Sequence, residues 1–416
     1  LALDPLTGHP HLAYYRSYPD GGGSLMYTWY NGMAWTTELV DGRGAETAKA
    51  AYAAAYPDVG RYASIALDSN GRPHVAYYDV SGGALRYAHR TVDGDWIIEP
   101  VDDGSVGEFC SLALNKFNEP RIAYYNRAQG NLMLASLTEN GWQIESPESL
   151  GNLGSSAEVA LDPVTQRPRI VYRDNDNNSL KFAYFNGSEW VILSVDDSGS
   201  TGNDVGLALD SKGMAHIVYQ VFLGDKNYLM YAVQSGDNFF RYELEEGPGT
   251  GYFPSIALLP GDYPAVAYND QTAHALRYAW YDGDEWRFYT VDTQGESVGW
   301  YTSLAVLEDK VAVAYWTTGG LRYVTLDHKS ETSTSAETGT GGGGGGGGCF
   351  IATAAFGGYC ESAVLALTET RDAALCASNP GKALVGLYYA VSPGVAERLS
   401  ASDSAFLRRM LKLLAR

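Results

Sequence analysis

The chain has 416 residues, of which 45% are apolar, so it can bury a sizeable core and is not disordered throughout. Its net charge of −20 argues against nucleic-acid binding, which requires basic patches. No apolar run approaches the roughly 18 to 20 residues that span a bilayer, so the sequence predicts no membrane span.

Composition favours an exported β-protein, because the chain has 48 glycines and 31 tyrosines but little lysine. The sequence begins in mid-pattern at Leu1, which indicates a mature or truncated form whose signal peptide has been removed. Charge is unevenly distributed. From Gly341 onward seven Lys/Arg exceed five Asp/Glu, so a tail of charge +2 follows a body of charge −22.

One phrase recurs seven times over the first three-quarters of the chain. The first two copies read LALDPLTGHPHLAYY from Leu1 and SIALDSNGRPHVAYY from Ser64. The first apolar residues of the copies are 1, 65, 112, 159, 207, 256 and 304, so the spacing is 64 once and then 47 to 49. A period in the forties with four strand-like pieces is typical of a propeller blade. The sequence therefore predicts an all-β seven-bladed β-propeller over residues 1–326, with the Ser-Ile-Ala-Leu type strand lining the axis.

The fourth strand-like piece of most units carries an aromatic residue. These residues are Trp35, Trp96, Trp142, Trp190 and Trp286, with Phe239 or Phe240 in the fifth unit. We expect each to pack between neighbouring sheets, where a large apolar side chain is best buried, rather than to stack on a sugar. The strand that carries it should be the outermost one.

Two units depart from the pattern. The first is longer by about 16 residues, and the excess, residues 42–58, has an Ala-rich centre that favours a short helix. The seventh unit ends at Leu326 after three strands, without a Trp-bearing fourth. Propellers usually complete such a blade with a strand from the other terminus. This closing strand is missing from the sequence, so an unpaired edge is predicted at this blade.

No known catalytic set is recognisable in the sequence. His11, His74 and His216 occupy one place in the repeat, which favours a packing or turn role. The triplet DSG at residues 197–199 falls where other units have a blade-connecting turn. The run DNDNN at residues 174–178 has oxygen ligands at alternating positions, as a Ca²⁺ loop does, but lacks the Gly and the bidentate Glu, so a solvated hairpin is favoured. We therefore expect no catalytic, cofactor-binding or metal-binding residue, and no enzyme.

The residues after the last strand differ in composition. Residues 327–348 are rich in Ser, Thr and Gly and end in eight glycines, Gly341 to Gly348, so they form a linker. Residues 349–416 contain amphipathic stretches and predict three short helices, a small domain that is marginal by itself.

This last domain resembles the short C-terminal CFI-box domain of many exported bacterial proteins. The likeness rests on CFIATAAFG at Cys349–Gly357, LTETRDAAL at Leu367–Leu375, GKALVGLYYAVSP at Gly381–Pro393 and VAERL at Val395–Leu399. The propeller repeats are similar, more loosely, to those of secreted bacterial repeat proteins. The resemblance implies export to the outside or the surface of a bacterium and a role of the tail in sorting, attachment or assembly.

Three cysteines of the tail are candidates for a disulfide bridge. If residues 361–377 form one helix, Cys360 and Cys376 lie roughly 24 Å apart and cannot pair within it. An extended Cys349 segment folded back along the helix would reach Cys376, and this bridge is favoured. Cys110, in the propeller, is expected to be a free buried thiol.

Two functions fit these features. In the first, a non-enzymatic extracellular protein assembles into a filament or surface layer, or attaches to the cell surface, through its tail. The segment Cys349–Phe356 would supply the missing strand to a neighbouring copy, with Phe350 and Ile351 on opposite faces. Alternatively, residues upstream of Leu1 supply this strand and the tail only anchors the protein. The alternative is a lectin-like propeller that binds glycans through Tyr and Trp rims, with the tail as an anchor.

Overall fold

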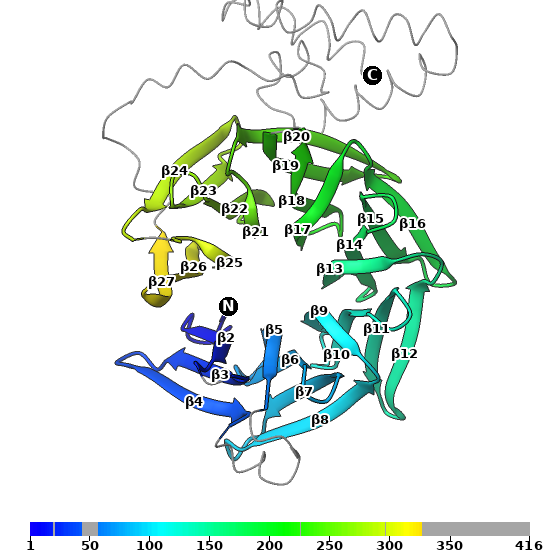
Figure 1. Cartoon of the computed structure of the whole chain (residues 1–416), viewed down its shortest axis with the longest axis vertical. Helices are drawn as coiled ribbons and strands as arrows, with labels where there is room; N and C mark the ends of the chain where they lie inside the picture. Colours follow the sequence, from blue (N-terminus) through cyan, green and yellow to red (C-terminus); the bar gives the residue numbers. More distant parts are fainter. Residues whose placement is uncertain (20, 44–56, 225, 296, 327–416) are drawn as a thin grey trace, which may run out of the picture.

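The computed structural model describes residues 1–19, 21–43, 57–224, 226–295 and 297–326. These residues form seven antiparallel sheets arranged around a central axis (Figure 1). The prediction of a seven-bladed β-propeller is therefore confirmed. The innermost strand of each sheet is the first one, which carries the beginning of the repeated phrase (the Ser-Ile-Ala-Leu type strand). The Trp-bearing strand is outermost, as expected.

Each blade is a run of consecutive strands. Blade 1 has β1 (Ala2–Leu3), β2 (Pro10–Ser17), β3 (Gly23–Tyr30) and β4 (Trp35–Asp41); blade 2 has β5 (Val59–Leu67), β6 (Pro73–Asp79), β7 (Ala84–Arg90) and β8 (Trp96–Asp103). Blade 3 has β9 (Val106–Leu114), β10 (Pro120–Asn126), β11 (Asn131–Thr138) and β12 (Gly141–Glu148); blade 4 has β13 (Leu153–Leu161), β14 (Pro168–Asp174), β15 (Ser179–Phe185) and β16 (Trp190–Asp196). Blade 5 has β17 (Ser200–Leu209), β18 (Ala215–Leu223), β19 (Lys226–Ser235) and β20 (Asn238–Gly247); blade 6 has β21 (Tyr252–Leu259), β22 (Tyr263–Asp270), β23 (Ala275–Tyr281) and β24 (Trp286–Asp292). Blade 7 has β25 (Trp300–Leu307), β26 (Lys310–Thr317) and β27 (Gly320–Leu326).

The hydrophobic core lies in layers between adjacent blades. In one layer Leu85 and Tyr87 of blade 2 pack with Ile122 and Tyr124 of blade 3, and all four are buried. The middle strands are apolar on both faces because each sheet has a neighbour on either side, which explains continuous apolar runs such as HVAYY in β6. Aromatic residues of the fourth strands close these layers, because Trp96 packs edge-on against Tyr27 of the preceding blade with ring centroids 5.3 Å apart. Phe239 takes this place in blade 5, 5.5 Å from Phe182.

The repeated histidines are packing residues, as expected from their spacing. The Nδ1 atoms of His11 and His216 lie 2.5 and 2.6 Å from the hydroxyls of Tyr27 and Tyr231 in the same blades. His74 makes the same bond in blade 2. Burial lowers the pKa of His11 and of His74 to about 4, so these imidazoles are neutral inside the blades at pH 7.

A second repeated contact joins each blade to the next one. A tyrosine of the second strand donates its hydroxyl hydrogen bond to a carboxylate that ends the fourth strand of the preceding blade. The pairs are Tyr77–Asp41, Tyr124–Asp102, Tyr172–Glu148, Tyr219–Asp196, Tyr268–Glu245 and Tyr315–Asp292. We call this contact the inter-blade latch. In every case the carboxylate follows the aromatic residue of its strand by six positions.

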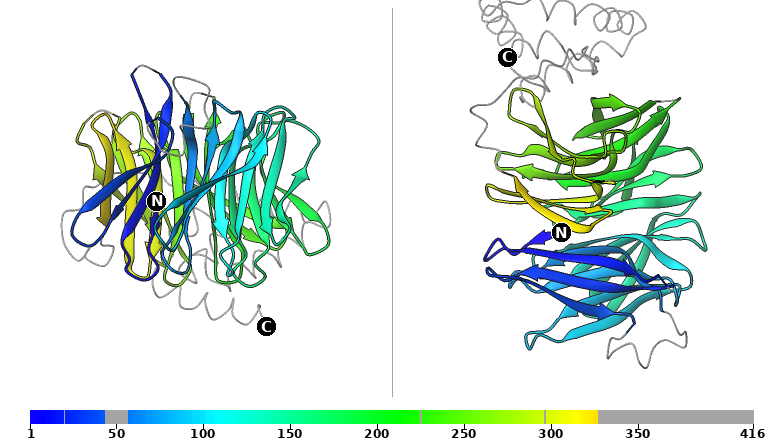
Figure 2. Two further views of the ribbon diagram at one scale, coloured as in Figure 1. Left: turned by 90° about the horizontal axis from the view of Figure 1, so that it is seen from below. Right: turned by 60° about the vertical axis from the view of Figure 1, so that its left-hand side comes forward.

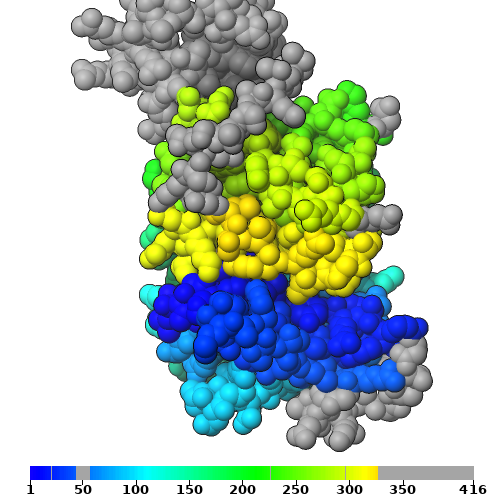
Figure 3. Space-filling view, turned by 90° about the vertical axis from the view of Figure 1, so that its left-hand side faces the viewer, coloured from blue at the N-terminus to red at the C-terminus, as the bar shows by residue number. Residues whose placement is uncertain are grey.

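The seventh blade differs as the sequence predicts, because it has three strands and β27 is its last one. Figure 1 shows β27 between the rim strands β24 and β4, without an outer neighbour among the described strands. Seen from two further directions, blades 7 and 1 lie side by side at this seam (Figures 2 and 3). The latch is also incomplete at the seam: Tyr14 occupies the repeated position in β2, and its hydroxyl has no hydrogen-bond partner among the described residues.

The latch gives a stability prediction with an internal control. Tyr219→Phe removes a buried hydrogen bond of 2.8 Å to Asp196, so we expect the free energy of unfolding to fall by about 1 to 3 kcal/mol. Tyr14→Phe should change it by less than about 0.5 kcal/mol, because no carboxylate in the described part of the chain accepts from that hydroxyl. Denaturant unfolding of both variants measures the difference, and equal losses would show that the latch does not join the blades.

Several expectations concern residues outside the described part of the chain. They are the helix in the insertion, whose centre is residues 44–56, the linker with Gly341 and Gly348, and the small helical domain of residues 349–416. The assembly residues Cys349, Phe350 and Ile351 and the disulfide candidates Cys360 and Cys376 belong to that domain. These stay predictions. Cys110 is described, and it is a buried free thiol as expected. Among the described residues, none of the structure's helices has the length and apolar character required to cross a bilayer.

Candidate functional site

Antiparallel strands place the same strand ends of every blade on one face of the disc. The inner strands begin on the face where the second strands end, and we call this the connector face, because the chain also passes there from one blade to the next. The opposite face carries the turns between first and second strands, and we call it the turn face. The two faces are the two sides of the disc in Figure 2.

Glycines shape the starts of the inner strands on the connector face. Near the start of an inner strand, a glycine with positive φ passes close to a leucine on the third strand of the preceding blade. A Cβ atom added to Gly60 would lie 2.7 Å from Cα of Leu25, and one on Gly154 would lie 2.7 Å from Cα of Leu132. Only glycine permits this approach at these φ angles. The same contact is made by Gly107, Gly251 and Gly299.

The residue two positions after each of these glycines also has a left-handed backbone, but it is not a glycine. These residues and their φ angles are Tyr62 (54°), Phe109 (53°), Ser156 (53°), Phe253 (49°) and Tyr301 (52°). They lie where the pairing of the inner strand with the second strand shifts register. Four of the five are aromatic, although a left-handed backbone disfavours such side chains.

The four aromatic residues form two pairs at the connector-face starts of the inner strands, a region that we call the mouth. Tyr62 and Phe109 have ring centroids 4.7 Å apart, and Phe253 and Tyr301 have ring centroids 4.5 Å apart. Tyr62 is 43% exposed and Tyr301 is 65% exposed, so each pair presents an aromatic surface to solvent. We call these four residues the mouth aromatics.

Hydrogen bonds between adjacent blades hold this mouth in place. Cys110 donates its thiol to the carbonyl oxygen of Tyr62 at 3.0 Å, and Thr302 donates its hydroxyl to that of Phe253. The backbone N–H of Phe253 donates to Oδ2 of Asp204 at 3.2 Å. The left-handed segments are therefore fixed by neighbouring blades, and their side chains are presented from a rigid ring.

Further aromatic and polar side chains surround the mouth. The ring centroid of Tyr125 lies 6.4 Å from that of Phe109, and the hydroxyl of Tyr125 donates a hydrogen bond to Oδ1 of Asn152 at 2.7 Å. Arg127, on the same side, pairs with Glu108 at 2.9 Å and keeps most of its side chain in solvent. On the other side Trp316 of β26 is 42% exposed. The connector face thus combines aromatic surfaces with neutral hydrogen-bonding groups and with one ion pair.

Two carboxyl groups of the inner strands have a raised pKa. Burial raises the pKa of Asp204, which lies between the two aromatic pairs in chain order. Burial also raises the pKa of Glu158 to about 7, although the hydroxyl of Ser111 donates to its Oε2 atom at 2.6 Å and partly offsets this effect. Glu158 stands at a position that Ser64 and Ser111 occupy in other blades, so one inner strand carries an ionisable side chain where others carry a serine.

Glu158 predicts a pH dependence of stability. Its pKa in the folded protein is about 7, above the usual glutamate value of 4.5, so between these two pH values the folded state keeps a proton that the unfolded state has lost. Stability from this group is full below about pH 4.5 and falls as the pH rises to 7, by about 2 to 3 kcal/mol in total. Glu158→Gln should therefore be more stable than the wild type at pH 8. Unfolding at pH 5 and pH 8 tests this, with the exposed Glu189→Gln as control, and an unchanged pH dependence in Glu158→Gln would contradict it.

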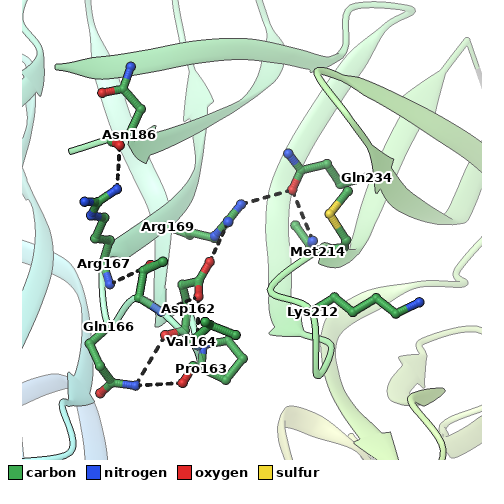
Figure 4. Close-up of polar contacts among 12 residues, drawn as sticks. Asp162, Pro163, Val164, Gln166, Arg167, Arg169, Asn186, Lys212, Met214 and Gln234 are labelled. Carbon is green, nitrogen blue, oxygen red and sulfur yellow. Dashed lines mark hydrogen bonds and ion pairs between the residues drawn. The ribbon is translucent and has the colours of Figure 1, made fainter. Parts of the chain in front are cut away.

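The turn face carries a different polar cluster, which Figure 4 shows for blades 4 and 5. Asp162 accepts hydrogen bonds from the backbone N–H groups of Val164 and Thr165 and from Nη2 of Arg169 at 2.6 Å. Asp68 and Asp210 cap the equivalent turns of their own blades, so the cluster repeats a turn motif. We assign it a structural role.

Two sequence motifs are also structural. In the DNDNN run, Oδ1 of Asp174 accepts from the backbone N–H groups of Asp176 and Asn177, and Nζ of Lys181 lies 3.1 Å from its Oδ2. The run forms the turn between β14 and β15, as the hairpin prediction states. The DSG triplet connects β16 to β17. In the described ranges, no group of three or more His, Cys, Asp or Glu residues is placed to hold a metal ion.

No protein-family model matches the chain, and no curated protein sequence matches it. Solved structures do match. A SapL1 lectin in complex with α-methyl fucoside is 13% identical over 70% of this chain and 94% of its own, with a TM-score of 0.49. An α-L-arabinanase of Penicillium chrysogenum with arabinobiose is 13% identical over 65% and 93%, with a TM-score of 0.46. The polysaccharide lyase Uly1 is 10% identical over 76% and 87%, with a TM-score of 0.48. At these identities and scores the matches assign no ligand or reaction to this chain.

The matches correct one prediction. We expected no enzyme because no known catalytic motif occurs in the sequence. This prediction was wrong, because the absence of such motifs does not exclude an enzyme. The matched proteins include an arabinanase and polysaccharide lyases. Missing motifs therefore do not exclude an enzyme for a chain of this kind, and its enzyme status is not established.

Sequence reasoning missed the mouth aromatics. Most tyrosines fall on repeated strand positions, which favours a packing role, and the latch tyrosines have that role. The signal for the others is a glycine followed two residues later by an aromatic residue, just before the repeated phrase. It reads GRY from Gly60, GEF from Gly107, GYF from Gly251 and GWY from Gly299.

Proposed function

We propose that the propeller binds carbohydrate at the mouth formed by its inner strands, on the connector face. The observation that carries the proposal is the set of mouth aromatics. Each is held on a left-handed backbone, which costs of order 1 to 3 kcal/mol, at a site where glycine would remove the strain. Strain of this kind is typical of functional sites.

The chemistry of the mouth fits a sugar. A pyranose ring has an apolar face of C–H groups and a rim of hydroxyls, so its binding site needs an aromatic surface beside hydrogen-bonding groups. Tyr62 and Phe109 supply the surface on one side, and Tyr125, Asn152 and Arg127 lie beside them with donors and acceptors. Because Arg127 is paired with Glu108, a neutral glycan fits this side better than a polyanion.

Two separate aromatic pairs favour an extended ligand. Tyr62 and Phe109 come from blades 2 and 3, whereas Phe253 and Tyr301 come from blades 6 and 7. A single sugar stacks on one pair only, while an oligosaccharide can contact both across the mouth. We therefore infer that oligosaccharides bind more tightly than their monosaccharides.

A glycan array probed with the full chain tests the proposal. We expect binding to a subset of neutral oligosaccharides, followed by titration calorimetry of the best one and of its monosaccharides. Incubation of the same glycan with the protein, followed by chromatography, shows whether binding leads to cleavage. If no glycan on the array binds above the level of a denatured sample, the proposal is wrong.

The self-assembly reading has a different basis. It rests on the segment Cys349–Phe356, which lies outside the described residues, and it stays a prediction. It also relied on the outer edge of blade 7, where β27 has no fourth strand beside it among the described strands.

A further inference from the structure

We propose that Asp204 determines the specificity of the glycan site, by accepting hydrogen bonds from the hydroxyls of a sugar unit that stacks on Phe253 and Tyr301. The residue thereby selects a neutral sugar at this unit and disfavours an acidic one, whose carboxylate it repels. This inference rests on the proposed carbohydrate binding and deepens it, because it names the group that recognises one unit of the glycan.

Asp204 occupies the place in blade 5 that the mouth aromatics occupy in blades 2, 3, 6 and 7. Like each of them, it stands two positions after a glycine and two positions before the start of the repeated phrase. Ser156 has this place in blade 4. In blade order the inner strands therefore present two aromatic residues, then Ser156 and Asp204, then two aromatic residues again. Two small polar side chains separate the aromatic pairs on this side of the mouth.

A direct contact places the Asp204 carboxylate beside the second aromatic pair. Its Oδ2 atom accepts a hydrogen bond from the backbone N–H of Phe253 at 3.2 Å, and the ring centroids of Phe253 and Tyr301 lie 4.5 Å apart. The Oδ1 atom has no hydrogen-bond partner among the described residues and is not cut off from solvent. Because the side chain is half-buried, this second oxygen is free to accept from a ligand.

The fold does not require a carboxylate at this place. The backbone N–H groups of Phe109, Ser156 and Tyr301 are equivalent to that of Phe253, and no side chain in the described part of the chain accepts from them. Burial raises the pKa of Asp204, because the ionised side chain loses hydration. A carboxylate that the fold does not need, and whose burial is costly, is typical of a binding site.

The groups that remain free here are hydrogen-bond acceptors. The hydroxyl of Ser156 donates to the carbonyl oxygen of Asn203 at 2.5 Å, so its lone pairs can only accept, as can Oδ1 of Asp204. Sugar hydroxyls are donors that suit both, and they bond more strongly to a carboxylate than to a neutral group. No arginine or lysine in the described ranges pairs with Asp204, so an acidic sugar would be repelled.

Asp204→Asn tests the proposal by titration calorimetry of the full chain with the neutral oligosaccharide that binds best on the glycan array. We expect at least about tenfold weaker binding, because an amide oxygen is a weaker acceptor than a carboxylate. The amide oxygen can still accept from the N–H of Phe253, so the aromatic pair keeps its place. Asp284→Asn, in the exposed turn between β23 and β24, is the matched control and should bind as the wild type does.

Denaturant unfolding separates a ligand contact from a structural role. We expect the unfolding midpoint of Asp204→Asn to equal or exceed that of the wild type, because the substitution removes the cost of burying a charge. A lower midpoint together with weaker binding would mean that Asp204 only holds the backbone of Phe253, and would overturn the proposal.

A double-mutant cycle identifies the aromatic pair that shares the sugar unit with Asp204. Tyr301→Ala combined with Asp204→Asn should weaken binding by less than the product of the two separate factors, because both changes act on one sugar unit. Tyr62→Ala combined with Asp204→Asn should give the full product, since Tyr62 belongs to the other pair. The reverse pattern would overturn the assignment.

The array measures the selection itself. Asp204→Asn should narrow the difference in binding between neutral glycans and glycans that contain uronic acids, and an unchanged difference would overturn the role in selection. If the wild type binds no glycan, both this inference and the proposed function are wrong. If the wild type binds and Tyr62→Ala, Phe109→Ala weakens binding, but Asp204→Asn binds as tightly as the wild type, only the assignment of Asp204 is wrong.

Discussion

The double variant Tyr62→Ala, Phe109→Ala is expected to bind the best array glycan at least about tenfold more weakly than the wild type. This loss corresponds to about 1.4 kcal/mol, which is modest for two aromatic hot-spot residues. The two rings lie 4.7 Å apart and form one surface, so removing both leaves the glycan without that stacking platform. Titration calorimetry with the same glycan measures the change.

A matched control lies on the turn face. Phe117 is an aromatic residue that is 70% exposed in the turn between β9 and β10, so Phe117→Ala removes a similar area from the opposite side of the disc. We expect its affinity to equal that of the wild type. Tyr62→Gly adds a second check, because it removes the ring and relieves the strained backbone at φ 54°. Full binding by the double variant, or loss of binding by Phe117→Ala, would contradict the assigned site.

Gly154→Ala is expected to lower the free energy of unfolding by about 3 kcal/mol or more. Gly154 has a φ of 103°, where an alanine is strained, and its added Cβ would lie 2.7 Å from the backbone Cα of Leu132 in blade 3. A backbone atom cannot rotate away as a side chain can, so the two blades must separate at their buried leucine layer. Denaturant unfolding measures the loss.

Gly141→Ala separates the strain from the contact. Gly141 has a φ of 88°, but an added Cβ would meet nothing within 4 Å. This variant should lose only the cost of the strained backbone, about 1 to 2 kcal/mol. Similar losses in the two variants would show that the close approach between blades contributes nothing, and the account of the channel mouth would need another basis.

Much of the fold could be predicted because its signal repeats. Seven copies of one phrase indicate seven blades. The aromatic residue that recurs in the fourth strand, such as Trp96 or Trp286, indicates the outermost strand. The missing fourth strand after Leu326 was predicted in the same way, because the seventh unit has three strand-like pieces where the others have four. Each of these inferences uses a contact that is local to one blade or the same between every pair of blades, so one sequence holds several independent examples of it.

The candidate site was not predicted, for the same physical reason. Tyr62 and Tyr77 look alike in the sequence, because both are tyrosines at repeated positions. They differ in the backbone. Tyr77 is buried on a regular strand, whereas Tyr62 has a left-handed backbone two residues after a glycine and is exposed at the mouth. The raised pKa of Glu158 similarly depends on its burial in the folded protein, where Ser111 of the neighbouring blade contacts it from 47 residues earlier in the sequence.

Hydrogen exchange with and without the bound glycan tests the central claim most directly, because it locates the ligand on the full chain. The account predicts that protection appears in the starts of the inner strands, at residues 59–63, 106–110, 252–254 and 300–302. Protection confined to the turn face, such as residues 162–167 and 210–214, or to the β27 edge would contradict it.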